Sequence, residues 1–412
     1  MREFVKNNKI SCFVILLLIV SIWAFNEQKL ITYPIKILYL LVMGFICIKL
    51  GRVTLPLQIW ALVMIVISVF SCLIAGLNSS SLFTLLNVVQ VFLIGFVTFG
   101  YLNSREKMLF FFASFVAGGL ILTLRLLLTT PFSVFLSFER LGESIGYNAN
   151  DVGDKAMIAA LSCVFLIRLV KNNLARLSLL FAFVILLAIV LFSGSRKDLL
   201  GLMLGVFIVY TFGLKKKRYL VISLVILFLL SFVLYRIMMT NESLYLTIGR
   251  RFETLIATLS GGSEQGSIDI RKVYISRAWE LIANSYFIGI GLGQFAVVSG
   301  YGVYCHCDYL EVMCSFGLIG FLVYYSPILI SVLRIAFKKR KTALDHSVFS
   351  LAVVILFVLI TMVMYTSAYS IIILSLIAFQ SRSIVNCNFA DSGVFRDAKK
   401  ERMLLNRYLK QS

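Results

Sequence analysis

The chain has 412 residues, of which 60% are hydrophobic, and it contains 35 Phe and 18 Tyr but only 4 Pro. Continuous apolar stretches of about 18–22 residues recur along it, the length that a helix needs to cross about 30 Å of hydrocarbon. This composition excludes a water-soluble globular domain, and the continuity of the runs excludes a membrane barrel, whose strands alternate in polarity. The sequence therefore predicts an all-α polytopic membrane protein.

Taken in chain order, the apolar runs predict about twelve transmembrane helices. They cover approximately residues 10–25, 34–50, 55–76, 82–101, 108–129, 153–170, 177–193, 198–213, 219–236, 308–333, 347–365 and 368–381. The first follows the basic start MREFVKNNK without a clear cleavage site, so we expect a retained helix. We expect one integral membrane domain over 1–412, with an outer loop at 130–154, a large outer loop with short amphipathic helices at 237–307, and a charged tail at 382–412.

The distribution of charge predicts the orientation of these helices. With the N-terminus in the cytoplasm, the inner segments carry 26 Lys and Arg residues and six acids, whereas the outer segments carry 11 basic residues and thirteen acids. Both termini are then cytoplasmic. The formal net charge of +20 is therefore a topological signal of the cytoplasmic face, and it requires no nucleic-acid partner.

His306 is one of two histidines and the only one predicted on the outer face. It precedes the sequence DYLE, in which Asp308 followed by Glu311 is typical of a helix N-cap with an acid three residues on. The positive end of a helix dipole disfavours imidazolium, so the ring is expected to be neutral and able to accept a proton. A histidine that only caps the turn or contacts lipid headgroups fits the position equally well.

Basic residues that topology does not require are the other candidates. Arg196 and Lys197 follow a flexible SGS segment, and their side chains are expected either to anchor at the membrane interface or to turn inward. Asp198 is expected to cap the next helix. In the large loop, Arg271 shares a helical face with Ile275, Ala278 and Ile282. The loop's basic residues contact either lipid phosphates or a phosphate-bearing substrate.

Three further patterns have simpler explanations. Cys305 and Cys307 flank His306, but known metal sites leave two or more residues between ligands, so we expect no metal. The glycines of GIGLG, residues 289–293, follow no strand, which favours a tight turn over a dinucleotide site. In YNANDVG, Asn150 or Asp151 is expected to cap a helix, although an amide there also suits sugar hydroxyls.

Together these motifs resemble the membrane glycosyltransferases that comprise O-antigen and capsule polymerases and O-antigen ligases. The resemblance is carried, in order, by YNANDVG, SGSRKDLLGL, IRKVYISRAWELIANSYFIGIGLGQF and HCDYLEVMCSFGLIGF. The sequence departs from the family at Cys307, where asparagine is usual, and at Tyr286 and Ala149, where proline is common.

The resemblance implies transfer of a glycan from undecaprenyl pyrophosphate to a hydroxyl of an acceptor sugar, without metal or cofactor. It implies His306 as general base, and Arg196 and Arg271 as the groups that stabilise the pyrophosphate. The remaining substrate-binding candidates on the outer face are Arg251, Arg277, Lys197, Arg140, Asn150 and Glu311. The implied location is the bacterial cytoplasmic (inner) membrane, with the site facing the periplasm or exterior and with a flippase and a chain-length regulator as partners.

Polymerase and ligase share this donor and differ in acceptor. YNANDVG and the HCDYLE form favour a polymerase of O-antigen or capsular repeat units. A ligase that transfers polymer to lipid A core is the alternative. A transporter or flippase is disfavoured, since such proteins are usually built from related halves with charges inside the spans. A structural scaffold is the remaining alternative.

Overall fold

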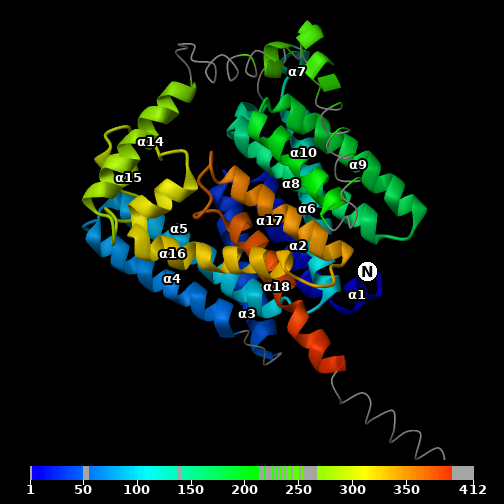
Figure 1. Ribbon diagram of the computed structural model, residues 1–412, viewed down its shortest axis with the longest axis horizontal. Coiled ribbons are helices and arrows are strands. Elements are labelled where there is room, and N and C mark those ends of the chain that lie inside the picture. Colours follow the sequence, from blue (N-terminus) through cyan, green and yellow to red (C-terminus); the bar gives the residue numbers. More distant parts are fainter. Residues whose placement is uncertain are drawn as a thin grey trace, which may run out of the picture.

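The computed structural model describes residues 2–49, 55–136, 141–212 and 267–391, together with isolated positions between 218 and 253. Throughout these described residues every regular element is a helix (Figure 1). The elements are α1 (Arg2–Asn7), α2 (Lys9–Ala24), α3 (Lys29–Lys49), α4 (Leu55–Ile74), α5 (Ser79–Tyr101), α6 (Arg105–Thr129), α7 (Phe132–Leu136), η1 (Glu143–Ile145), α8 (Ala149–Leu169), α9 (Asn173–Phe192), α10 (Arg196–Thr211), η2 (Tyr245–Gly249), α14 (Ser267–Asn284), α15 (Phe295–Val298), α16 (Asp308–Ala336), α17 (Ala343–Val358) and α18 (Ala368–Asp391).

A helix covers most of each predicted apolar run except 219–236, which lies largely outside the described residues, and the main differences are at the ends of α17 and α18. Several begin up to five residues earlier than predicted, because polar residues occupy the first turn. The side chains of Asn78 and Asn172, for example, cap α5 and α9 by accepting backbone N–H groups of the first turn.

The predicted helix 347–365 is wrong at its end, because α17 stops at Val358. The following residues turn back toward the start of α16. The Leu359 carbonyl accepts the Asp308 N–H at 2.9 Å, and Asp308 Oδ1 accepts the N–H groups of Met364 and Tyr365 at 2.6 and 2.9 Å. These hydrogen bonds occupy the Leu359 carbonyl and the N–H groups of Met364 and Tyr365, which a longer helix would need for its own hydrogen bonds.

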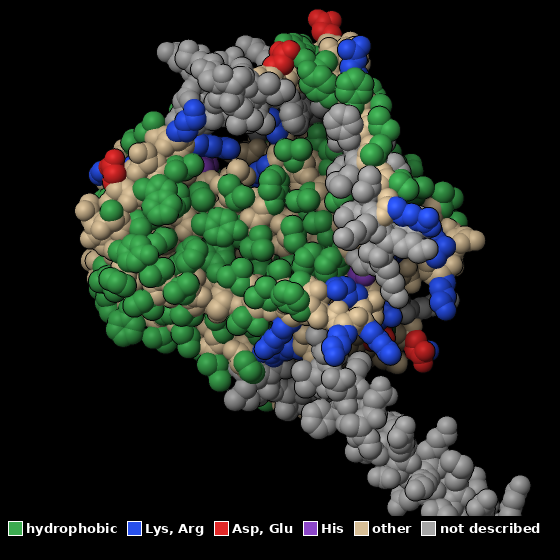
Figure 2. All heavy atoms as spheres, in the orientation of Figure 1, with side chains coloured by type: hydrophobic (Ala, Val, Ile, Leu, Met, Phe, Trp, Pro, Cys, Tyr) green, Lys and Arg blue, Asp and Glu red, His purple; other side chains and the backbone are tan. Residues whose placement is uncertain are grey.

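Six helices of the described part are long and apolar enough to cross a membrane: α3, α4 from Pro56, α5, α6, α9 and α16. Three shorter apolar helices, α2, α17 and residues 368–382 of α18, accompany them. Large apolar side chains face outward, such as Leu30 at 93% and Leu128 at 77% exposed. Figure 2 shows hydrophobic side chains over the middle of the visible face, with Lys and Arg toward its upper and lower edges. The chain is accordingly a multi-pass membrane protein.

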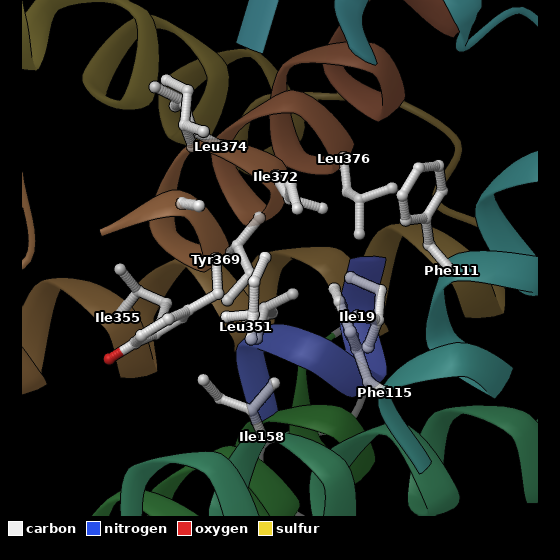
Figure 3. Packing of buried hydrophobic residues seen from close by; sticks show 14 of the residues in the cluster. Ile19, Phe111, Phe115, Ile158, Leu351, Ile355, Tyr369, Ile372, Leu374 and Leu376 are labelled. Carbon is white, nitrogen blue, oxygen red and sulfur yellow. The ribbon is translucent and has the colours of Figure 1, made fainter. Parts of the chain in front are cut away.

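In the part of the core drawn in Figure 3, apolar side chains of α2, α6, α8, α17 and α18 pack together. Trp23 stacks on Phe115 with ring centroids 5.0 Å apart, and its Nε1–H donates to the Lys155 carbonyl at 3.1 Å. Gly119 lets α6 approach α8 closely, since a Cβ there would lie 2.5 Å from that of Ala159.

The connections between helices form two sets of contacts. Those predicted on the outer face meet one another: the Asn26 N–H donates to the Tyr147 hydroxyl, and the Asn78 amide bonds to Gln294. At the ends predicted on the inner face, Gln380 of α18 donates to Asp345 of α17 at 2.7 Å, and Lys338 pairs with the same carboxylate at 2.9 Å. The candidate residues of the sequence analysis belong to the first set.

α16 is broken at Gly317, whose φ of 65° and ψ of −172° are essentially restricted to glycine. The break allows the Leu318 and Ile319 N–H groups to donate to the carbonyls of Tyr286 and Phe287. A Cβ on Gly317 would lie 2.3 Å from the Phe287 carbonyl carbon, so the two segments are in direct backbone contact.

Replacing Gly317 with alanine should therefore destabilise the protein by at least about 1–3 kcal/mol, through backbone strain plus the clash with Phe287. The measurement is the apparent melting temperature of the detergent-solubilised protein. Gly76→Ala is the matched control, because Gly76 also has positive φ (+78°) but open space around it. Equal melting temperatures for the two variants would contradict the proposed backbone contact.

Candidate active site

His306 lies in a short turn that is fastened to the first turns of α16. Its φ is +59°, a left-handed conformation that is uncommon outside glycine. On its N-terminal side, the Cys305 N–H donates to Glu311 Oε2 at 2.9 Å, and the Cys305 thiol contacts the Cys307 carbonyl at 3.0 Å. Cys305 and Glu311 are both buried, so the turn holds the histidine in one place.

The predicted N-cap at Asp308 is wrong. The N-cap is Cys307, which makes no side-chain capping bond, and Asp308 is the first helical residue. Its buried carboxylate instead accepts the Tyr325 hydroxyl at 2.6 Å together with the N–H groups of Met364 and Tyr365. Asp308 therefore joins α16 to the turn that follows α17.

Aromatic rings surround the His306 imidazole. The Tyr274 ring of α14 is stacked nearly parallel to it, at 5.9 Å between centroids and 11° between planes, and the Tyr304 ring lies 4.4 Å away. Burial, and secondarily the positive charge of Arg271, lower the pKa of His306 below its ordinary value. The ring is therefore neutral at neutral pH.

α14 brings Arg271 to this histidine by packing its apolar side on α16. Ala278 and Ile282 are buried with Leu310 in a small second core, whereas Ile275, expected on the same face, is 37% exposed. Arg277 projects elsewhere, and its guanidinium pairs with Glu280 at 2.7 Å. The structure thus places Arg271, but not Arg277, beside His306.

The glycine-rich segment 289–293 is a tight turn, as predicted, with positive φ at Gly289, Gly291 and Gly293. The Ile290 N–H donates to the Cys314 carbonyl, and the Leu292 N–H to the Ser71 carbonyl. The turn therefore fixes the end of the large loop against α16 and α4.

The N-termini of α8 and α10 form the second part of the site. The cap of α8 is Asn148, not Asn150 or Asp151 as predicted, because its side chain accepts the Asn150 N–H at 2.9 Å. α10 begins at Arg196, which is half-buried, and its N-cap position is Ser195, so the expected cap at Asp198 is also wrong.

Lys197 joins these two helix ends. Its Nζ lies 2.5 Å from Asp154 Oδ1 and 3.2 Å from Asp198 Oδ1, and it contacts Met362 Sδ at 3.4 Å. Both carboxylates are fully buried, and the second oxygen of each makes no hydrogen bond with the described residues. Two acids thus face one ammonium group in the interior.

Tyr304 connects the two parts of the site. Partial desolvation of this otherwise exposed side chain, followed by the negative charge of Asp151, raises the pKa of Tyr304, whereas the charges of Lys197 and Arg271 act in the opposite direction. The phenol is therefore within electrostatic reach of both α14 and the ends of α8 and α10. Sequence reasoning missed this residue, although an aromatic residue two positions before the histidine was a visible signal.

The remaining predicted residues contribute less to this picture. Arg251 and Arg140 lie outside the described residues. Asn150 is half-buried in the first turn of α8. Within the described part of the chain, no three His, Cys, Asp or Glu side chains form a metal-binding group.

Residues 181–325 match the family model described as O-antigen ligase. The resemblance to the O-antigen polymerase and ligase family is thereby confirmed. The matched residues of the chain include Arg196, Arg271 and His306. The matched family is a glycosyltransferase-like class of membrane enzymes that act on lipid-linked glycans. A comparison with curated proteins finds no significant match to the chain.

Replacing Lys197 with methionine should be strongly destabilising, because it leaves Asp154 and Asp198 buried without their cation. The expected cost is about 3–5 kcal/mol, typical of a buried ion pair that loses one partner. It is measured as a fall in the melting temperature of the purified protein.

Lys338→Met is the matched control. Asp345, the partner of Lys338, is also buried but keeps donors from Thr342 and Gln380, so the loss should be smaller. If Lys197→Met lowered the melting temperature no more than Lys338→Met, the buried Asp154–Lys197–Asp198 cluster would not be a major contributor to stability.

Proposed function

We propose that the protein polymerises lipid-linked oligosaccharide repeat units of O-antigen or capsular polysaccharide on the outer face of the bacterial cytoplasmic membrane. The observation that carries this proposal is the cluster of His306 with Tyr274 and Tyr304, which the turn after α17 connects to Lys197 at the start of α10. These residues come from segments predicted to face outward, and much of the site lies within the O-antigen ligase match.

In the proposed reaction, the acceptor hydroxyl gives its proton to the neutral imidazole of His306. The acceptor oxygen then attacks the anomeric carbon of the donor sugar. The bond between that carbon and the pyrophosphate oxygen breaks, and undecaprenyl pyrophosphate leaves with the electron pair. A single displacement of this kind inverts the anomeric configuration and requires no metal.

The leaving pyrophosphate needs positive charge, which we assign to Arg271 and Arg196. Guanidinium groups suit phosphate oxygens because they donate two parallel hydrogen bonds. Arg196 begins α10, where the helix dipole also favours an anion. The negative charge that develops on the leaving group would therefore meet preorganised donors.

The other candidates receive subsidiary roles in this proposal. Glu311 holds the Cys305 turn and so positions His306, and Lys197 holds the ends of α8 and α10 together. Asn150 is assigned to the sugar hydroxyls. Arg277, Arg251 and Arg140 would attract the anionic substrate to the outer face, together with membrane lipid phosphates.

An O-antigen ligase is the second candidate, favoured by the description of the matched family. The donor half of the site would be the same, and only the acceptor would change to lipid A core. A flippase and a chain-length regulator are the expected partners in either pathway.

Replacing His306 with asparagine should reduce product by about 10²–10⁴-fold, because the amide has no proton-accepting nitrogen. Asparagine tolerates the left-handed backbone of this position, whereas alanine would add strain. Product is measured as glycan length and amount in a deletion strain that expresses each variant at equal membrane levels. His346→Gln is the control and should be fully active. Normal glycan from His306→Asn would contradict the assignment of His306 as the general base.

The same deletion strain separates the two candidates. Single-repeat glycan on lipid A is the result expected of a missing polymerase. Long polymer that remains on the carrier lipid would instead favour the ligase.

The activity should fall only when the pH drops below the ordinary histidine value of about 6.5, because burial and Arg271 lower the pKa of His306 and keep it neutral to lower pH. Arg271→Met removes one of these causes, so the acid limb of kcat/KM should move to higher pH.

Arg271→Lys keeps the positive charge, so the acid limb should stay at the same pH. The rate should nevertheless fall about tenfold or more, because lysine cannot make the bidentate contact. An unchanged rate in Arg271→Lys would reduce Arg271 to a membrane anchor.

A further inference from the structure

The segment immediately before His306 is presented to its surroundings. Residues 300–304 are all exposed, with Tyr301 at 40% and Tyr304 at 43%, although the segment is anchored at both ends. Phe295 of α15 is fully buried before it, and Cys305 is fully buried after it. The exposed rings are thus held by fixed backbone.

Backbone bonds define the shape of this segment. The Gly302 N–H donates to the Ala296 carbonyl at 3.0 Å, and both Gly300 and Gly302 have positive φ. Open space surrounds both glycines, because a Cβ at either would meet nothing within 4 Å. A ligand can therefore approach the loop without displacing protein atoms.

The rings of the segment continue into the histidine. Tyr301 packs against Tyr274 at 4.9 Å between centroids, Tyr274 stacks on His306, and the Tyr304 ring lies 4.4 Å from that of His306. The Tyr304 hydroxyl makes no hydrogen bond to the described residues, so its donor and acceptor are available.

Aromatic rings with nearby polar groups form a typical carbohydrate-binding surface. One face of a pyranose ring carries C–H groups that stack on an aromatic ring, while its hydroxyls need hydrogen-bond partners around the rim. Here the free Tyr304 hydroxyl supplies such a partner, and Asp151 lies within electrostatic reach of it. A lipid tail would need no polar rim.

We propose that the exposed rings of Tyr301 and Tyr304 are the platform on which a pyranose ring of the acceptor glycan stacks, which places its hydroxyl at His306. Tyr274 does not face the sugar in this arrangement; it supports the imidazole from behind. The inference rests on the glycan-transfer function proposed above and adds the acceptor subsite to it.

The experiment measures sugar binding apart from catalysis. The full-length protein is placed in lipid nanodiscs and titrated with the repeat-unit oligosaccharide, freed from its carrier lipid by mild acid, while saturation-transfer NMR reports contact with ring protons. Tyr304→Ala and Tyr301→Ala should each raise Kd by about tenfold. Tyr304→Phe keeps the ring and should stay within about threefold of the wild type.

Tyr286→Ala is the matched control, because Tyr286 is 44% exposed on the same loop but contacts Phe287 rather than the histidine cluster. Its Kd should equal that of the wild type. A wild-type protein that binds the oligosaccharide, with Tyr301→Ala and Tyr304→Ala binding equally well, would overturn the platform and leave the proposed function standing.

Two other outcomes also count against the platform. If Tyr286→Ala and Tyr301→Ala lower the melting temperature alike while sugar affinity is unchanged, the tyrosines belong to the aromatic belt at the membrane interface. If the wild-type protein transfers no saturation to the oligosaccharide, the platform fails together with the glycan-transfer function.

Discussion

The turn between α17 and α18 holds the two parts of the candidate site together. Asp308 accepts two backbone N–H groups of this turn, and its own N–H donates to the Leu359 carbonyl. On the other side of the turn, Met362 touches the ammonium group of Lys197. The start of α16, which carries the histidine turn, is therefore fixed relative to the ends of α8 and α10 through a few backbone bonds around one buried carboxylate. Because the Asp308 carboxylate accepts three hydrogen bonds, they offset the free-energy cost of removing it from water.

The sequence was sufficient for much of the fold because apolar run length and cap residues act locally. Helices such as α5 and α9 could be placed within a few residues, since only the hydrocarbon thickness and the first turn decide their ends. The end of α17 could not be predicted in this way. It depends on hydrogen bonds to Asp308, about fifty residues away, and no local pattern records such a partner.

The candidate site shows the same division. His306 was singled out from residue type and predicted side, and Arg271 through the resemblance to the family; the structure packs α14, which carries Arg271, against His306. The helix start at residue 308 was predicted correctly, but Asp308 was misread as the N-cap, because an acid near an N-terminus looks the same whether it caps its own helix or binds a distant turn. Tyr304 was missed because an aromatic residue in a membrane protein is usually packing or interface, and only the fold reveals what surrounds it.

The left-handed backbone at His306 has a consequence for the evolution of this position. A residue there must adopt the left-handed backbone of the turn as well as supply the proton acceptor that we propose, so a replacement meets two separate requirements. Asparagine and aspartate are the replacements that the backbone tolerates best. A relative that lacks the histidine is therefore expected to carry a small polar residue at this position of the turn.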